Sequence, residues 1–106
     1  MLTIGIESSC DDTSVAILRN GSELLSLVKK SQVDLHAPFG GVVPELAARG
    51  HMDSIFPVMA EALQQSGISL EEIDLVAGTT GPGLVGSLLV GLTAAKTLAL
   101  CLRKPF

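Results

Sequence analysis

The residues best suited to chemistry gather in one short segment, 8–13, which reads Ser-Ser-Cys-Asp-Asp-Thr. It offers hydroxyls, a thiol, two carboxylates and successive backbone N–H groups. Backbone amides and hydroxyls can bond the oxygens of a polyphosphate, while carboxylates bind the accompanying Mg²⁺ directly or through water. A bare carboxylate pair would repel phosphate, so the metal is part of this hypothesis. The plainer interpretation is that Asp11 and Asp12 only form a turn between strands, and these residues alone favour it.

Strands are predicted on both sides of this segment, because apolar and polar residues alternate there with the period of a strand that has one face in the core. The apolar positions are Leu2, Ile4 and Ile6 before the segment and Val15 and Ile17 after it. We therefore expect a hairpin with the polar segment at its tip. Asn20 and Gly21 both tolerate positive φ and predict a second hairpin, with a third strand over 23–31 antiparallel to the second.

A long helix is predicted over 44–66. Pro44 suits a first helical turn, and Gly67 ends the helix. Gly50 and Pro57 both weaken it, so a pair of helices split near Gly50 remains an alternative. Its apolar face follows helical spacing and comprises Met52, Ile55, Phe56, Met59, Ala62 and Leu63.

The segments on either side of this helix are predicted from their turn residues. Proline and glycine break any pattern over 34–41, so a loop is expected there, with Leu35 and Phe39 tucked under the lobe. After the helix, Ser69 with Glu72 three positions later predicts a capping box for a single turn. Residues 74–80 then read as a buried strand.

Residues 81–86, Gly-Pro-Gly-Leu-Val-Gly, join this strand to a final helix and match G-x-G-x-x-G literally. A dinucleotide site would need an acidic residue about twenty positions further on, and none follows. The segment also lacks the Gly-Lys-Ser/Thr ending of a Walker phosphate loop. We therefore favour a tight turn with close helix packing.

The final helix, 84–102, is apolar nearly all round, which predicts burial on several sides. Ser87, Gly91 and Ala95 are spaced four apart and would let another helix approach closely. A membrane span fits the length, but polar residues interrupt the helix and no aromatic belt flanks it, so no membrane contact is predicted.

A length of 106 residues is enough for one modest core and indicates a single domain. A net charge of -4, with scattered basic residues and three Phe as the only aromatics, argues against a nucleic-acid surface in this segment. A hydrophobic content of 47% is high for a self-contained domain and indicates apolar surface meant for a partner. Cys10 and Cys101 lack metal-type spacing and fit reduced thiols in a cytoplasmic protein. His36 and His51 have no third ligand at a recognisable spacing, so ordinary polar roles near the acidic turn or at a helix surface are expected.

Three segments together resemble the amino-terminal lobe of the TsaD family. They are G-I-E-S-S-C-D-D-T-S-V-A-I, G-G-V-V-P-E-L-A-A-R-G-H and T-T-G-P-G-L-V-G-S-L-L-V-G-L, in order and at the expected separations. The resemblance implies an α/β lobe of the ribonuclease-H-like, actin-like ATPase (ASKHA) class, with a mixed sheet, antiparallel hairpins and packed helices. It also implies a transferase that moves threonylcarbamoyl from its adenylate to the adenosine beside the anticodon of tRNA.

Site residues follow from the same resemblance. Asp11 and Asp12 are expected near the reacting carbonyl and a metal, as catalytic residues. Ser9, Cys10 and Thr13 are expected to bind the cofactor, ATP with Mg²⁺ or the threonylcarbamoyl-adenylate. Family members commonly carry Glu where Asp12 stands, which leaves an acid one methylene shorter in a site where about 1 Å matters. They commonly carry Asp where Gly50 stands.

The resemblance further implies that residues 1–106 are the amino-terminal lobe of a two-lobed protein, cut before the histidine pair that holds iron or zinc. No metal ligand is assigned within the chain, and the fragment alone is expected to be inactive. Expected partners are a TsaB-like paralogue bound through helices 44–66 and 84–102, a TsaE-like ATPase and tRNA. Met52, Ile55, Met59, Gly91 and Ala95 are expected in the paralogue surface, which self-association could satisfy in the fragment.

Two other functions remain open from the sequence. The first is a non-catalytic scaffold such as TsaB, which shares the lobe but typically lacks the cysteine and acid pair of this turn. The second is the metalloendopeptidase activity after which the family was once named. Neither an activated-water site nor a nucleophile and base pair is visible to support it.

Overall fold

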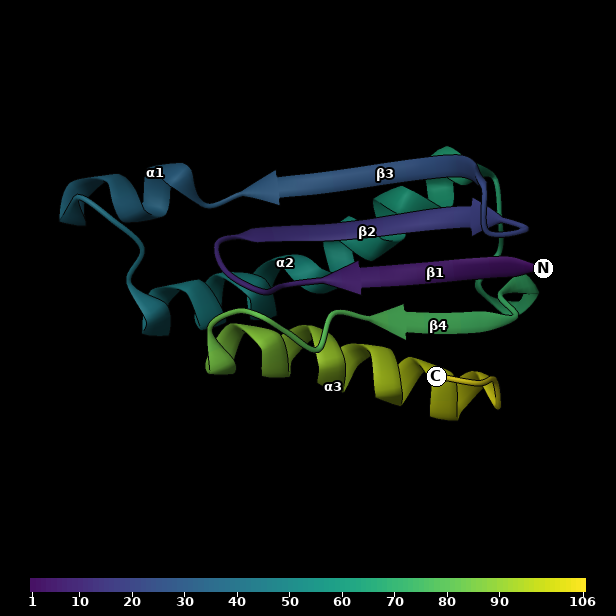
Figure 1. Ribbon diagram of the computed structural model, residues 1–106. Coiled ribbons are helices and arrows are strands. Elements are labelled where there is room, and N and C mark those ends of the chain that lie inside the picture. The colour runs from purple at the N-terminus through teal and green to yellow at the C-terminus, as the bar shows by residue number, and fades with distance from the viewer.

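The computed structural model describes all residues from Met1 to Phe106 and is built on a four-stranded sheet in the order β3-β2-β1-β4 (Figure 1). The strands are β1 (Leu2–Glu7), β2 (Asp12–Arg19), β3 (Glu23–Ser31) and β4 (Leu75–Gly78). The first three are antiparallel neighbours, while β4 pairs in parallel with β1. The mixed sheet and both hairpins predicted from the sequence are therefore confirmed.

Register in the first hairpin follows the alternation of apolar residues. Ile4 pairs with Ile17 and Ile6 with Val15, and all four side chains are buried on one face of the sheet. Burial of each such side chain is worth roughly 1.5–3 kcal/mol, and a slip by one residue would move the whole set to the other face. The polar segment is thereby held at the hairpin tip.

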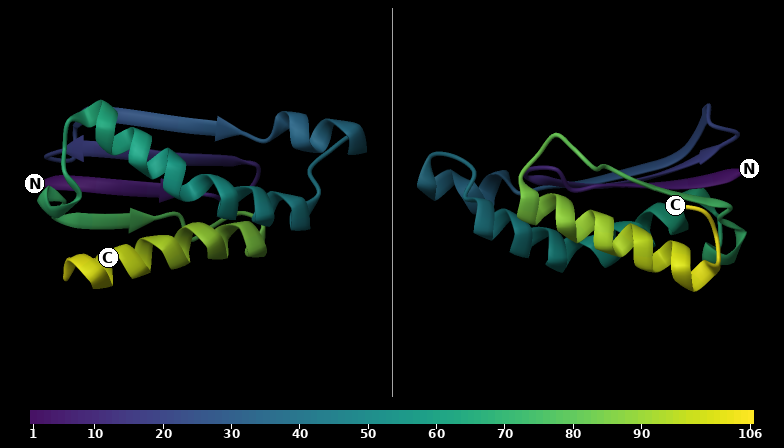
Figure 2. Two further views of the ribbon diagram at one scale, coloured as in Figure 1. Left: turned by 180° about the vertical axis from the view of Figure 1, so that it is seen from behind. Right: turned by 60° about the horizontal axis from the view of Figure 1, so that its bottom comes forward.

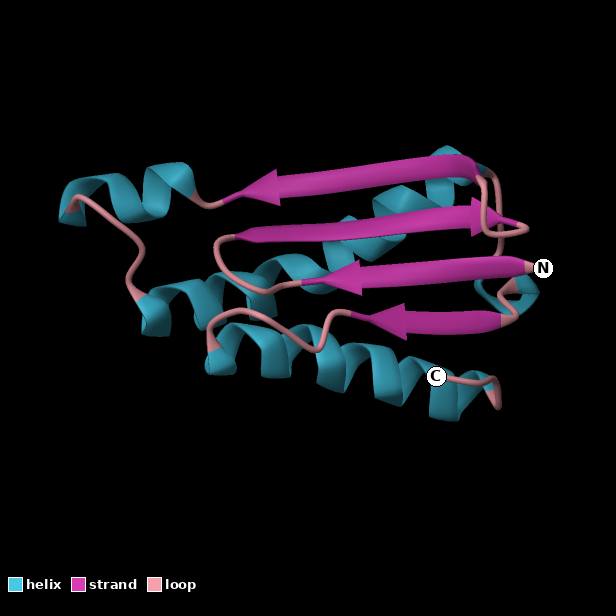
Figure 3. Cartoon of the chain, viewed as in Figure 1, coloured by secondary structure: helices cyan, strands magenta, loops and turns pink.

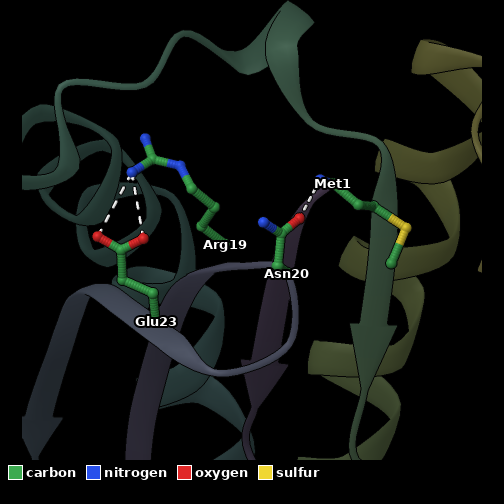
Figure 4. Close-up of polar contacts among 4 residues, drawn as sticks. All are labelled: Met1, Arg19, Asn20 and Glu23. Atoms are coloured by element: carbon green, nitrogen blue, oxygen red, sulfur yellow. Dashed lines mark hydrogen bonds and ion pairs between the residues drawn. The ribbon is translucent and has the colours of Figure 1, made fainter.

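The second hairpin turns at Asn20 and Gly21, which adopt φ of 52° and 72°. Figure 4 shows how this turn meets the start of the chain. The Met1 ammonium group donates to Asn20 Oδ1 at 2.7 Å, and Arg19 pairs with Glu23 at 3.3 Å across the exposed turn. This end of the sheet lies opposite the polar segment (Figure 1).

Two long helices, α2 (Pro44–Ser66) and α3 (Val85–Leu102), cover the same face of the sheet (Figure 2). The opposite face carries no helix. α2 runs unbroken through Gly50 and Pro57 and ends at Gly67 with φ of 70°, so the single-helix prediction is confirmed. The core between helices and sheet includes Ile4, Ile6, Val15, Ile17, Val28, Ile55, Val58, Met59, Ala62, Ile73, Val76, Ala95 and Ala99.

The prediction of a loop over 34–41 was wrong in part. The chain forms a single helical turn, α1 (Val33–His36), followed by a 3-10 turn, η1 (Ala37–Phe39). Leu35 and Phe39 are 42% and 64% exposed and are not tucked under the lobe. The polar His36 is buried instead, because its ring bonds the Gln32 side chain at 2.8 Å and the Val43 N–H at 3.1 Å.

Burial of α3 on several sides was also wrong. The helix buries one stripe of mostly small residues, Ser87, Leu88, Gly91, Ala95 and Ala99. Val85, Leu89 and Leu100 are 77%, 57% and 78% exposed. The small residues face the sheet, and their lack of bulk lets the helix lie close to β1 and β4. By length and hydropathy alone, α3 is the one helix that could cross a membrane.

The remaining short elements connect β4 to its neighbours. The predicted capping box before the 3-10 turn η2 (Leu70–Glu72) is present, with the Glu72 carboxylate accepting from the Ser69 N–H at 2.8 Å. After α3 the chain returns to the sheet, where the Val76 N–H donates to the Pro105 carbonyl at 3.0 Å. The chain thus passes along the free edge of β4.

Candidate functional site

The polar turn, residues 8–11, joins β1 to β2 at the same end of the sheet as the loop after β4 and the start of α2 (Figure 3). Three consecutive carbonyl oxygens of this turn each accept a hydrogen bond from a different element. The pairs are Ser9 O with Leu84 N at 2.7 Å, Cys10 O with His51 Nε2 at 2.9 Å, and Asp11 O with Gln32 N at 3.1 Å. These hydrogen bonds connect the turn to residues 81–86, called the glycine loop below, to α2 and to the end of β3.

The amide groups of the turn behave differently from its carbonyls. The backbone N–H groups of Cys10 and Asp11 donate no hydrogen bond within the chain. The Ser9 N–H donates to the Glu7 carboxylate. The turn thus has its carbonyl acceptors occupied by protein and two adjacent N–H donors free, the arrangement that favours an anion.

The turn begins at Ser8, whose side chain is buried against α3. Its hydroxyl donates to the Ser87 carbonyl at 2.6 Å and accepts from the Gly91 N–H at 2.9 Å. In an α-helix the N–H of residue 91 bonds the carbonyl of residue 87, so the Ser8 hydroxyl contacts both partners of one helical hydrogen bond. The turn cannot shift without disturbing α3.

Thr13 lies on the helix-covered face of β2, in step with Val15 and Ile17, and its side chain has no exposed surface. Its hydroxyl lies 2.7 Å from His51 Nδ1. A carbonyl oxygen can only accept, so His51 Nε2 must carry the proton that it donates to Cys10 O. In the neutral ring Nδ1 then accepts from the Thr13 hydroxyl. Thr13, expected to bind the cofactor directly, instead supports the turn from beneath.

The other predicted site residues, Ser9, Cys10, Asp11 and Asp12, are all partly exposed. Asp12 lies on the face of the sheet without helices, where its carboxylate is 3.7 Å from Lys29 Nζ. Burial raises the pKa of the Cys10 thiol, and the negative charge of Asp11 raises it further. Cys10 is therefore a weakly acidic thiol that carries less thiolate at neutral pH than a free cysteine.

A hollow of about 440 Å³ lies beside the turn on the uncovered face of the sheet. Its floor is made of small residues, among them Gly5, Ala16 and Gly78, and its polar lining comes from Glu7, Ser14 and Thr79. Glu7 is the one carboxylate in this lining.

The glycine loop packs directly on the turn. A Cβ at Gly83 would overlap the Ser9 carbonyl and lie 2.8 Å from Ser9 Cβ. The predicted close packing is thus seen at Gly83, where only glycine lets the two backbones come this close, whereas Gly81 has open surroundings and a Cβ at Gly86 would make only an ordinary contact with Ala48. The sequence did not indicate that Gly83 packs on the polar turn.

Gly50 also has a contact that the sequence did not indicate. A Cβ there would lie 2.6 Å from Gln32 Nε2. The Gln32 side chain crosses over Gly50 and donates to the Ala47 carbonyl at 3.2 Å. Gly50 therefore leaves room for the Gln32 side chain, and the backbone N–H of the same glutamine bonds the Asp11 carbonyl.

No group of three or more His, Cys, Asp or Glu side chains is arranged to hold a metal ion. Both ring nitrogens of His36 and of His51 are engaged in hydrogen bonds. The two carboxylates of the turn fit Mg²⁺ only as part of a set that ligand oxygens or water complete.

An apolar groove of about 660 Å³ runs between α2 and α3. Exposed side chains line it, including Met52 at 65% and Phe56 at 68%. The predicted docking residues Gly91 and Ala95 do not line it, since they face the sheet. The full lining is Met52, Ile55, Phe56, Met59, Leu70, Leu89, Val90, Thr93, Ala94, Thr97, Leu98 and Cys101.

Comparison with known proteins now gives the family. Residues 23–106 match the TsaD family model, described as tRNA N6-adenosine threonylcarbamoyltransferase. Proteins of that name from Protochlamydia amoebophila and Symbiobacterium thermophilum are 58% and 59% identical to the chain over 106 and 104 residues. The alignments cover 100% and 98% of this chain, but 31% and 30% of those proteins. The chain thus spans about a third of the length of the relatives it matches.

A fold comparison agrees with the observed architecture. YeaZ from Pseudomonas aeruginosa superposes with a TM-score of 0.69 at 20% identity, covering 98% of this chain and 42% of that protein. At this identity the likeness concerns the fold alone, an α/β lobe of the ASKHA type. On the strength of the family match, the resemblance noted in the sequence is confirmed, and the chain belongs to the TsaD family.

Proposed function

We propose that this chain is the nucleotide-facing lobe of a tRNA N6-adenosine threonylcarbamoyltransferase, and that the turn at 8–11 faces the phosphoryl groups of its activated substrate. One observation carries the proposal. Three successive carbonyls of the turn are bonded to protein, while the N–H groups of Cys10 and Asp11 make no bond within the chain, in a segment that carries the carboxyls of Asp11 and Asp12. Such donors recognise phosphate oxygens, and carboxylates bring the metal that phosphate requires.

Each residue then has a stated part. The free N–H groups and the Ser9 hydroxyl bond phosphate oxygens of ATP or threonylcarbamoyl-adenylate. Asp11 and Asp12 share Mg²⁺ with those oxygens and lie near the carbonyl that is transferred. Cys10 contributes its backbone N–H rather than its thiol. The raised pKa of the Cys10 thiol keeps it protonated, so it is not a reactive thiolate. Thr13 acts through His51 and touches no ligand.

The lobe is one half of a cleft in this proposal. Residues 1–106 form the amino-terminal lobe of a two-lobed protein, and the second lobe supplies the adenosine contacts and the ligands of an iron or zinc ion. The shared length with relatives supports this division, since the matched proteins extend well beyond the aligned part. The reaction, transfer of threonylcarbamoyl to an adenosine of tRNA, belongs to the whole protein.

The groove between α2 and α3 is the proposed docking site of a TsaB-like paralogue. Its exposed Met52, Phe56 and Leu89 are an apolar patch on two helices, the form in which helix pairs pack against each other. A TsaE-like ATPase and tRNA would join only the full complex, in the cytoplasm. In the isolated chain, a second copy would use the same groove.

A non-catalytic scaffold of the TsaB type is the competing function, favoured by the same groove. The two differ in the turn, because a scaffold has no need of free N–H groups in a segment that carries two carboxylates. A peptidase function gains no support from the one hydroxyl and imidazole pair in the chain. Thr13 and His51 are both fully enclosed and could not reach a peptide bond.

Titration of the chain with ATP in the presence and absence of Mg²⁺, followed through backbone amide resonances, tests the proposal. We expect millimolar binding that needs Mg²⁺, with shifts centred on residues 9–12. Asp11→Asn and Asp12→Asn should abolish the Mg²⁺ dependence, while Asp34→Asn, an exposed acid on α1, should not. Shifts that centre on the α2 and α3 groove, or binding indifferent to both aspartate substitutions, would contradict it.

A further inference from the structure

We propose that His51 is a positioning residue for the phosphoryl-binding turn, which it holds in the one orientation that presents N–H groups to the ligand. The inference rests on the proposed function for its consequence, but its geometry stands independently. His51 is carried by α2, 41 residues away in sequence from the Cys10 carbonyl that it binds. It is fully enclosed and lines neither the hollow on the uncovered face of the sheet nor the apolar groove.

One imidazole connects three elements. Nε2 donates to Cys10 O at 2.9 Å, in the turn, and Nδ1 lies 2.7 Å from Thr13 Oγ1, in β2. The ring itself is fixed by α2. Because both bonds are made by a rigid planar group that has no freedom left, the turn and the first residues of β2 are locked to the helix at a set distance.

The lock determines where the free amides point. The carbonyl of Cys10 and the N–H of Asp11 belong to one trans peptide unit, in which they project to opposite sides. Holding Cys10 O toward α2 therefore directs the Asp11 N–H away from α2. Leu84 N acts in the same way on Ser9 O and so directs the Cys10 N–H. His51 is the only side chain in this set.

This role requires a defined tautomer. Cys10 O has no proton to give, so Nε2 is protonated and Nδ1 accepts from Thr13. An apolar side chain of similar size would fill the space but leave Cys10 O and the Thr13 hydroxyl unpaired. The Cys10 peptide would then be free to rotate, and the Asp11 N–H would lose its direction.

Three variants separate this role from simple packing. His51→Gln keeps an amide N–H that can reach Cys10 O. His51→Leu keeps bulk and loses both bonds. Ser54→Ala is the matched control, because Ser54 is buried on the same helix one turn further on. The readouts in the 106-residue chain are affinity for Mg²⁺·ATP, ¹⁵N relaxation order parameters of the 9–12 amides, and long-range ¹H–¹⁵N correlations of the His51 ring.

We expect the wild-type ring to show a protonated Nε2 and an unprotonated Nδ1. His51→Leu should weaken Mg²⁺·ATP binding about tenfold and lower the order parameters of the 9–12 amides. His51→Gln should restore most of both, and Ser54→Ala should change neither even where it lowers the unfolding temperature. Equal affinities for the Leu and Gln variants and wild type would overturn the proposal, as would a protonated Nδ1 with a bare Nε2.

The outcomes distinguish this inference from the function on which it rests. If wild-type chain binds no Mg²⁺·ATP, the phosphoryl-binding function fails. The positioning role is then decided by the amide order parameters alone, which must still be lower in His51→Leu than in His51→Gln. Should His51→Leu fail to fold, the wild-type tautomer and the comparison of His51→Gln with Ser54→Ala decide the question.

Discussion

The Ser8 hydroxyl donates a hydrogen bond to the Ser87 carbonyl of α3 and accepts one from the Gly91 N–H. Residue 91 has no side chain, and a Cβ there would overlap Ser8 Oγ. The start of the acidic turn and the stripe of small residues on α3 therefore form one contact, in which a strand end is inserted into a helix surface. This contact makes the geometry of the turn sensitive to substitutions in a helix that touches no ligand.

Gly91→Ala should destabilise the lobe, because the new methyl group displaces Ser8. We expect a loss of about 1–3 kcal/mol in the free energy of unfolding, the usual cost of overpacking. Gly86→Ala on the same helix is the control, since a Cβ there meets only Ala48 Cβ at 3.6 Å. It should gain about 0.5–1 kcal/mol from helix propensity. Urea denaturation measures both, and equal effects of the two substitutions would refute the contact.

Ser87→Ala should leave the lobe as stable or more stable. The Ser87 hydroxyl is buried and has no hydrogen-bond partner, so its removal relieves an unsatisfied group and should gain up to about 1 kcal/mol. Ser8→Ala, by contrast, removes two hydrogen bonds at the same place and should cost about 1–3 kcal/mol. A clear loss of stability in Ser87→Ala would mean that its hydroxyl has a partner.

Gly83→Ala should change the turn more than it changes the fold. The added methyl cannot fit against the Ser9 backbone, so either the loop or the turn must move. We expect weaker Mg²⁺·ATP binding and shifted amide resonances at 8–11. Gly41→Ala is the control, because its surroundings are open and its φ is ordinary. Unchanged resonances at 8–11 would show that the loop yields instead of the turn.

Leu89→Lys should prevent the chain from self-associating. Leu89 is exposed and lines the groove, so a charge there opposes burial against a second copy or a paralogue. Leu100→Lys changes an even more exposed leucine of the same helix that lies outside the groove. Light scattering at high concentration should find wild type and Leu100→Lys associated and Leu89→Lys monomeric. A wild-type chain that stays monomeric would count against the docking surface.

Asp11→Asn should make the Cys10 thiol more reactive. The pKa of this thiol is raised first by burial and then by the Asp11 charge, which disfavours a neighbouring thiolate. Removal of that charge lowers the pKa, so at any pH below it a larger thiolate fraction is present and alkylation by iodoacetamide is faster. Peptide mass spectrometry follows Cys10, with Cys101 as reference within each sample. In denaturant, where the turn is lost, the two proteins should react alike.

Much of the framework was predictable because its signals are local. Strand alternation around the polar segment, the Asn20 and Gly21 turn, and the end of α2 at Gly67 depend on residues within a few positions of each other. The family resemblance added the ASKHA type, which the fold comparison supports. The prediction of a loop over 34–41 was wrong because each helical segment there is only a single turn long, too short for its periodicity to be visible in the sequence.

The amino-acid sequence by itself determined that a polar turn lies at the tip of a buried hairpin, because the alternation of apolar residues dictates which strand side chains face the core. Only the tertiary structure decided what holds that turn. The turn is contacted by four residues that lie 21 to 83 positions from their partners in it, and no periodicity links such distant positions; they are His51, Leu84, Gln32 and Gly91. It also decided that Leu89 of α3 is exposed. Whether a side chain is buried depends on which surface arrives to cover it, and here the sheet takes the small residues of α3 while its leucines face the groove and solvent.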